Sequence, residues 1–258
     1  MFNLHFDPVQ AFVHEPSKTV IMLCPKVMTQ FLRRFIGAGS AAHCSNANLA
    51  KGPVRGFPRA SARQCVSLLL NPNAYSTFAF VRNPYDRLQS VWQDKFFDGR
   101  HASLGLGEAG YSATIRRFAL PAVRRFARKN DLAGGTAGDL VPFDTFVRHV
   151  AATPSGRRNR HWEMQTRIIQ HGHFRFERLF KVETELEIGA QAIFGRIGFD
   201  HDWILENIDR RVNVSGRTRG SDYTPELADI AYGAFAADFE AFGYPRDSWG
   251  PKDERGGC

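Results

Sequence analysis

Two short apolar runs constrain the fold of this chain more than any other feature. The runs are Thr19–Cys24 and Ser76–Val81, and both contain β-branched residues. Such runs are typical of strands that are buried on both faces, as in a parallel sheet. Helical periodicity follows, around residues 62–70 and again over 86–97. Strands that alternate with helices predict an α/β fold with a mainly parallel central sheet flanked by helices.

Later segments continue this alternation. We expect helices over 113–128, 143–150 and 184–197, and a short strand over 179–182. The last helix has clear boundary residues, because Thr224 suits the N-cap, Pro225 suits the first helical position and Gly243 suits the end. No segment in the middle has the composition of an interdomain linker. We therefore expect a single domain over residues 1–258.

Composition places the chain among globular proteins. Of its 258 residues, 43% are hydrophobic and 23% are charged. No apolar stretch approaches the roughly 18–20 residues that span a membrane, and the first residues do not resemble a secretory signal. The four scattered cysteines predict neither a disulfide framework nor a zinc site. We expect a cytoplasmic protein without a metal, with peripheral contact to the inner membrane left open.

Charge is distributed unevenly along the chain. The formal net charge is +8, and no Asp or Glu occurs between residues 16 and 85, where nine Lys or Arg lie. This excess of positive charge favours a polyanionic partner: a nucleic acid, an anionic polysaccharide, a phosphorylated cofactor or an acidic membrane. Because this segment contains both apolar runs, it predicts an anion site near the ends of the two strands.

Each apolar run leads through a polar turn into a helix, and the two turns carry basic and hydroxyl side chains. The first turn contains Lys26 and Thr29, and the second begins with Arg82, eight residues before Ser90. The N-terminus of a helix offers unpaired N–H groups and partial positive charge, which suit phosphate. Neither turn has the GxxxxGK[ST] or GxGxxG pattern, so a Walker A loop and a dinucleotide-binding turn are both disfavoured.

At these residues the chain resembles the carbohydrate sulfotransferases that use 3′-phosphoadenosine-5′-phosphosulfate (PAPS), in particular the branch that includes the chondroitin and HNK-1 enzymes. Residues 25–33, PKVMTQFLR, are similar to the family's PKVxCTxxxR loop, with one residue fewer. Residues 80–96, FVRNPYDRLQSVWQDKF, are similar to its FVRDPxERLxSxYxxKF motif. Residues 161–165 (HWEMQ), 181–184 (KVET) and 238–244 (DFEAFGY) resemble its HWxPQ, GKxET and DFxxFGY motifs. The likeness spans about 19–245.

The resemblance implies a P-loop-like sulfotransferase fold, PAPS as co-substrate, and transfer of the sulfuryl group to a hydroxyl of a carbohydrate or glycoconjugate. Lys26 would stabilise the leaving group, with Arg82 and Ser90 on the 3′-phosphate. A late basic loop with Arg217 or Arg219 would close over that phosphate. The 5′ side would be lined by the first loop, namely Pro25, Lys26, Val27, Met28, Thr29 and Gln30.

The acceptor hydroxyl needs a general base, which favours histidine or a carboxyl group with a raised pKa. The candidates are His161 and His43, with Glu163 and Glu183 as lesser options. We expect Arg87 and Lys95 to form structural pairs with nearby acids. The basic residues of 124–129 and 157–160 suit either an anionic acceptor or a solvated face.

Two alternatives remain open at this stage. One is a protein of the same fold that binds a nucleotide or an anionic glycan without turnover. The other is a basic nucleic-acid-binding protein, although no known nucleic-acid motif occurs. Neither the acceptor nor the oligomeric state follows from the sequence.

Overall fold

A computed structural model of the chain describes residues 11–28, 32, 60–96, 115–135, 140–208 and 222–250. The chain divides into two compact units, and each unit is built from two segments. The first unit comprises Met1–Arg82 and Gln165–Val214, and the second comprises Asn83–Met164 and Ser215–Cys258. The expectation of a single domain stays a prediction.

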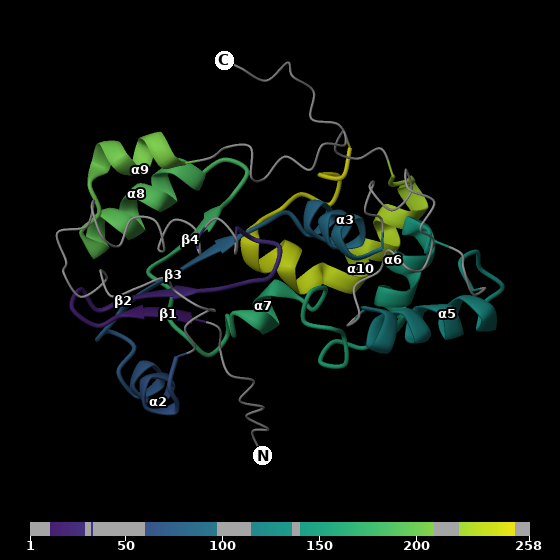
Figure 1. The fold of residues 1–258 in the computed structure, drawn as a ribbon, viewed down its shortest axis with the longest axis horizontal. Coiled ribbons are helices and arrows are strands. Elements are labelled where there is room, and N and C mark those ends of the chain that lie inside the picture. Colours follow the sequence, from purple (N-terminus) through teal and green to yellow (C-terminus); the bar gives the residue numbers. More distant parts are fainter. Residues whose placement is uncertain are drawn as a thin grey trace. The chain divides into compact units, whose positions relative to one another are not determined.

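The first unit contains a four-stranded sheet with strand order β1-β2-β3-β4 (Figure 1). The strands are β1 (Ala11–His14), β2 (Thr19–Met22), β3 (Ser76–Val81) and β4 (Arg178–Lys181). β2 pairs with β3 and β3 with β4 in parallel, whereas β1 pairs with β2 in antiparallel orientation. The expected mainly parallel sheet is therefore confirmed.

Burial explains why the two apolar runs became neighbouring strands. Every residue of β2 is buried, and so is β3 after its first residue. The rings of Phe78 and Phe80 lie 6.2 and 5.7 Å from that of Phe180 on β4. The helices of this unit are α2 (Ala62–Leu70), α7 (Gln165–Ile168), α8 (Leu186–Ile197) and α9 (His201–Asn207). α8 packs across β2, β3 and β4.

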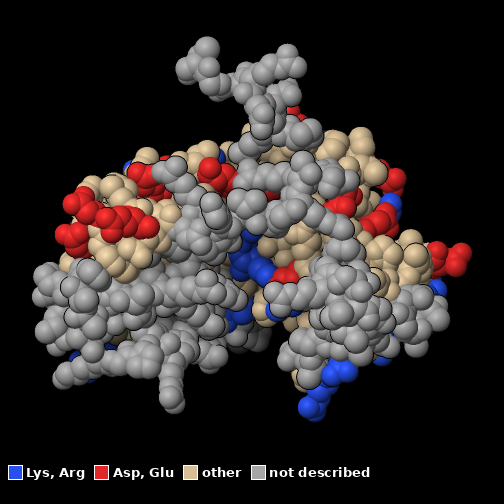
Figure 2. Space-filling view, turned by 45° about the horizontal axis from the view of Figure 1, so that its top comes forward, with Lys and Arg blue, Asp and Glu red and all other residues tan. Residues whose placement is uncertain are grey.

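Acidic side chains gather over the part of the surface that α8 and α9 occupy (Figure 2). Several acids of these helices and of the turn between them are exposed, among them Asp200, Asp202 and Glu206. The positive net charge is therefore not spread evenly over the first unit. This surface is unsuited to an anionic ligand.

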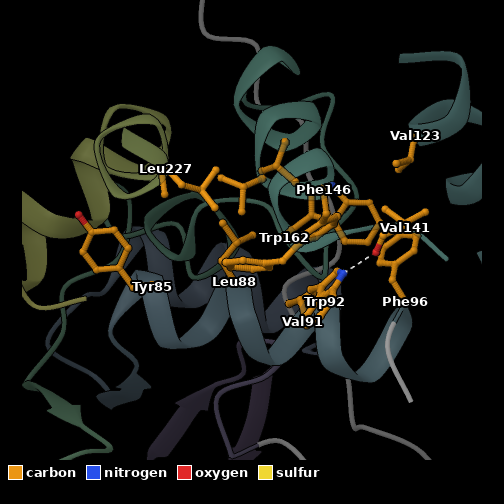
Figure 3. Packing of buried hydrophobic residues seen from close by; sticks show 14 of the residues in the cluster. Tyr85, Leu88, Val91, Trp92, Phe96, Val123, Val141, Phe146, Trp162 and Leu227 are labelled. Carbon is orange, nitrogen blue, oxygen red and sulfur yellow. Dashed lines mark hydrogen bonds between the residues drawn. The ribbon is translucent and has the colours of Figure 1, made fainter. Parts of the chain in front are cut away.

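The second unit is helical and is held together by an aromatic core (Figure 3). Its helices are α3 (Pro84–Lys95), η2 (Ile115–Ala119), α5 (Leu120–Lys129), α6 (Phe143–Ala152) and α10 (Pro225–Phe242). Trp92, Phe146 and Trp162 pack together at its centre. The indole N–H of Trp92 donates to the carbonyl of Val141 at 2.8 Å, which satisfies the one polar atom of that buried side chain.

Local sequence signals placed most helices well. Thr224 caps α10 and Gly243 ends it in the left-handed conformation, as predicted. The predicted helix over 113–128 is divided, because η2 is a π-helical turn that precedes α5. Pro121 lacks an N–H, so the carbonyl of Arg117 has no donor four residues later, which favours this change of hydrogen-bond register.

Neither a membrane-spanning helix nor a metal cluster occurs in the described ranges. None of the helices there is long and apolar enough to cross a membrane. In the same ranges, no three His, Cys, Asp or Glu side chains are grouped as metal ligands would be.

Close packing of α8 on the sheet depends on Gly189. A Cβ atom at this position would lie 2.7 Å from Cγ of Phe180 and 2.7 Å from Cε1 of Phe80. We predict that Gly189→Ala lowers the free energy of unfolding by about 1–3 kcal/mol, because the aromatic rings must shift. Urea denaturation measures the change.

Gly195 provides a matched control on the same helix, since a Cβ atom at that position would meet no other atom within 4 Å. Gly195→Ala should leave stability unchanged or raise it by up to about 1 kcal/mol, because alanine has the higher helix propensity. Equal effects of the two substitutions would contradict the packing argument.

Candidate functional site

The first unit presents a tight turn directly after β2. Pro25–Met28 follow the buried residues Leu23 and Cys24, and the N–H of Val27 donates to the carbonyl of Cys24 at 3.1 Å. Lys26 and Met28 have positive φ angles of 67° and 52°, whereas Val27 between them does not. Backbone with alternating sign of φ forms the concave arrangement of N–H groups that binds anions. The turn shares this alternation of φ, although the N–H of Val27 is already bonded to Cys24.

A helical hydrogen bond marks the exit from this turn. The N–H of Leu32 donates to the carbonyl of Met28 at 2.9 Å, and Leu32 is buried. This bond agrees with the predicted start of a helix near residue 31. The predicted ligands Thr29 and Gln30 lie outside the described residues, as do His43, Arg217 and Arg219.

Arg82 reaches the same turn from the neighbouring strand. It follows β3 directly and is only 7% exposed. Its Nη1 donates to the carbonyl of Lys26 at 3.3 Å. The two turns that the sequence singled out thus meet at the carboxyl ends of adjacent parallel strands, which is where α/β sheets commonly bind ligands.

Gln165 fixes the backbone of Arg82, a role that the sequence pattern did not predict. The N–H of Arg82 donates to Oε1 of Gln165 at 3.0 Å, and Nε2 of Gln165 donates to the carbonyl of Arg82 at 2.7 Å. Gln165 is fully buried. Its position as the last residue of the HWEMQ motif was the signal that could have identified it.

Asn83 and Ser90 belong to the second unit. Asn83 caps α3, since its Oδ1 accepts from the N–H of Tyr85 at 3.0 Å. Its Nδ2 donates to Oγ of Ser248 at 2.9 Å, and that hydroxyl donates to the carbonyl of Pro245 at 2.6 Å. Because Oγ of Ser248 must accept here, an amide suits this position better than the family's Asp. Ser90 is half-buried on α3.

Arg87 holds the segment that contains His161. It is 2% exposed, and its guanidinium donates to the carbonyl of Glu163 at 2.7 Å and to that of His161 at 3.1 Å. Both bonds give Arg87 a structural role, and its expected pairing with an acid stays a prediction. Lys95 does pair with a neighbouring acid, Asp94, at 2.9 Å.

Asn159 determines which nitrogen of His161 carries the hydrogen. Oδ1 of Asn159 lies 3.0 Å from both the main-chain N–H and Nδ1 of His161. A main-chain N–H only donates, so Oδ1 accepts, and Nδ1 must then donate as well. In the neutral ring the lone pair therefore lies on Nε2, the arrangement that a general base requires.

The carboxylate of Glu163 is enclosed by donors. It accepts from the hydroxyl of Ser155 at 2.9 Å, the N–H of Gly156 at 2.6 Å and the N–H of Met164 at 2.9 Å. Proline, the family's residue at position 164, has no N–H. The hydrogen bond from the N–H of Met164 to the carboxylate of Glu163 therefore depends on the replacement of that proline. These bonds give Glu163 a structural role in the loop.

Comparison with known proteins supports these motifs. The chain matches the sulfotransferase family over residues 10–245. It is 25% identical to carbohydrate sulfotransferase 10 of Rattus norvegicus over 256 residues, which cover 91% of this chain and 67% of the relative. The human protein of that name is 25% identical over 95% of this chain and 71% of its own length.

Carbohydrate sulfotransferase 12 of Mus musculus is 26% identical over 188 residues, which cover 67% of this chain and 41% of the relative. No solved structure matches the chain. The family match covers all four strands of the sheet and the HWEMQ motif. The chain therefore belongs to the sulfotransferase family, the enzymes that use PAPS as sulfuryl donor.

Proposed function

We propose that this enzyme transfers a sulfuryl group to a hydroxyl of a carbohydrate or glycoconjugate acceptor by in-line displacement. The hydrogen bond from Arg82 to the carbonyl of Lys26 carries the proposal, because it joins the two phosphate motifs in one unit. The names of the relatives supply the acceptor class, since carbohydrate sulfotransferases 10 and 12 are similar to the chain over two thirds of its length or more.

The residues of the first turn fit the 5′ side of PAPS. The positive φ angles of Lys26 and Met28 give the backbone a concave form, and the ammonium of Lys26 adds a full positive charge. When bound, PAPS supplies the sulfuryl group and a phosphate leaving group. The family motif extends this lining to Thr29 and Gln30. Arg82, and Ser90 by the same motif, would hold the 3′-phosphate.

Lys26 is the proposed electrostatic catalyst. Charge develops on the bridging oxygen as the bond to sulfur breaks, and a positioned ammonium stabilises that charge. Its backbone is held from two sides, since its carbonyl accepts from Arg82 and the turn closes through Val27. A fixed donor of this kind needs little reorganisation during the reaction.

His161 is the proposed general base. Nδ1 donates to Asn159, so Nε2 of the neutral ring accepts the proton from the acceptor hydroxyl. Arg87 holds the main chain of His161, and the next residue, Trp162, is buried in the core of the second unit. The positive imidazolium that forms is stabilised by the oxygen of Asn159.

Calorimetric titration with 3′-phosphoadenosine-5′-phosphate tests the cofactor site. We predict that Arg82→Ala weakens binding by about 1.5–3 kcal/mol, because a charged hydrogen bond to phosphate is lost. Ser90→Ala should weaken it by about 0.5–1.5 kcal/mol.

The role of Lys26 is tested by the rate of transfer of labelled sulfate from PAPS. Lys26→Ala should lower kcat for sulfuryl transfer by about 10²–10³, because the charge on the leaving oxygen loses its stabilising ammonium.

Arg63→Ala is the matched control, since this exposed residue of α2 carries the same charge. It should bind the nucleotide as the wild type does. Folded wild-type protein that fails to bind would refute the proposal. Binding without transfer of labelled sulfate to any carbohydrate acceptor would instead favour a non-catalytic binder.

Gln165→Glu tests how Arg82 is positioned. The carboxylate would face the carbonyl of Arg82 at the place where Nε2 now donates, so we predict a loss of about 1–3 kcal/mol in stability and weaker nucleotide binding. Lowering the pH to about 5 should reduce both losses, because a carboxylic acid donates again. Urea denaturation and calorimetry at two pH values measure this.

Gln191→Glu makes the same chemical change on the half-buried face of α8 and should leave both quantities near their wild-type values. If Gln165→Glu behaves like this control, the amide of Gln165 does not determine the position of Arg82.

The base assignment is tested by kcat as a function of pH. His161→Ala should lower kcat by about 10²–10⁴ with unchanged nucleotide affinity. Asn159→Asp keeps the acceptor and adds a negative charge, so it should shift the acidic limb of the profile to higher pH. Asn159→Leu removes the acceptor and should lower kcat.

His173→Ala, at an exposed histidine, serves as the control and should leave the profile unchanged. A His161→Ala enzyme with an unaltered acidic limb would exclude His161, and His43 would then be the next residue to substitute.

A further inference from the structure

The second unit contains a surface hollow lined mainly by arginine. Its volume is about 250 Å³, below the roughly 300–1,000 Å³ of pockets that enclose drug-sized ligands. The lining comes entirely from η2 and α5, namely Arg116, Leu120, Pro121, Arg124, Arg125 and Arg128. Four of the six lining residues are thus arginines, although the guanidinium of Arg128 also donates to the carbonyl of Gly135 at 2.9 Å.

The helical period brings these arginines together. Positions 121, 124, 125 and 128 recur at intervals of three, one and three residues, which is one stripe of a helix. No Asp or Glu occurs in residues 115–130. On the neighbouring α6 and on α10, Asp144 and Glu226 both bind Arg148, at 3.0 and 2.8 Å. Those two carboxylates are therefore already matched by a cation outside the hollow.

The arginines of the second unit differ in whether their guanidinium groups are bonded within the protein. Arg158 donates to the carbonyls of Thr153 and Ala234 and lies 5.1 Å from the ring centre of Phe235, so it is a structural residue. Arg116 and Arg125 are exposed, and within the described residues neither makes a hydrogen bond or an ion pair. Their donors are available to a ligand.

The hollow offers apolar surface beside the charge. Leu120 and Pro121 form part of its lining, and the neighbouring Phe118 on η2 is 62% exposed. Planar guanidinium groups bind carboxylate or sulfate with two parallel hydrogen bonds. A sugar ring presents C–H groups to an apolar surface. A π-helical turn such as η2 is rare and often occurs at functional sites.

We infer that this hollow is a subsite for an acidic saccharide and binds the carboxylate or sulfate ester of one sugar unit. The choice of a saccharide rests on the proposed function, whereas the anionic group follows from the lining alone. The hollow selects acceptors by charge and takes no part in the chemical step, since neither Lys26 nor His161 contributes to its lining. Nucleic acid is the competing ligand, and it would use many phosphate contacts along an extended basic surface.

Calorimetry without nucleotide tests the subsite. The probes are a chondroitin hexasaccharide with carboxylates alone, its sulfated form, neutral maltohexaose and a 12-base-pair DNA duplex. The variant is Arg116→Gln/Arg125→Gln, and its matched control is Arg63→Gln/Arg167→Gln, which removes two exposed arginines of the first unit. We expect the variant to lose about tenfold in affinity for acidic hexasaccharides at low salt, and the control to lose none.

Comparison of the two chondroitin probes shows whether carboxylate or sulfate is the group bound, and either result supports the subsite. Maltohexaose should bind equally weakly to all proteins. Equal affinity of variant and control for acidic hexasaccharides would overturn the proposal, because the arginines would then form a solvated face. Tighter binding of the duplex, with a larger loss in the variant, would also overturn it.

Titration with 3′-phosphoadenosine-5′-phosphate separates this proposal from the proposed function. All variants should bind the nucleotide as the wild type does, since the substituted residues lie outside the cofactor motifs. Hollow-dependent binding of acidic saccharide by a protein that does not bind the nucleotide would leave the subsite standing and refute the sulfotransferase mechanism proposed for the turn.

Discussion

The pair of hydrogen bonds between Gln165 and the main chain of Arg82 is the constraint on which the cofactor side of this protein depends. β3 ends at Val81, so the N–H and carbonyl of the buried Arg82 need partners outside the strand pairing. The amide of Gln165 satisfies both at once. With its backbone fixed, the Arg82 guanidinium reaches the carbonyl of Lys26, and the turn after β2 is held from the neighbouring strand.

Two departures from the family motifs, at Asn83 and Met164, are compensated by local partners. Asn83 replaces an aspartate, and its amide donates to the hydroxyl of Ser248. Met164 replaces a proline, and its N–H donates to the carboxylate of Glu163. In each case the new residue supplies a donor to a nearby acceptor. The loop that carries His161 therefore keeps a defined structure although its sequence has changed.

Local patterns predicted the elements but not the contacts between them. The bounds of α2 and β3 followed from apolar runs and turn residues, and those of α10 from its cap residues. β1 was missed because it has only four residues, and α9 was missed because its seven residues mix polar with apolar types. Gln165 lies 83 residues from Arg82 in the chain, and no periodicity encodes such a contact. The two main-chain partners of Arg87 were not predicted for the same reason, since a bond to a main-chain carbonyl does not depend on residue type.

Net charge alone is a poor guide to where this protein binds anions. The guanidinium groups of Arg87 and Arg158 donate hydrogen bonds to main-chain carbonyls, and that of Arg148 forms ion pairs with two carboxylates. The outer surface of α8 and α9 is acidic despite the positive total. A cation is available to a ligand where the fold gives it no partner of its own, and among the described residues of the second unit this holds for Arg116 and Arg125. Lys26 is presented differently, because the turn fixes its backbone at positive φ while its side chain stays half-exposed.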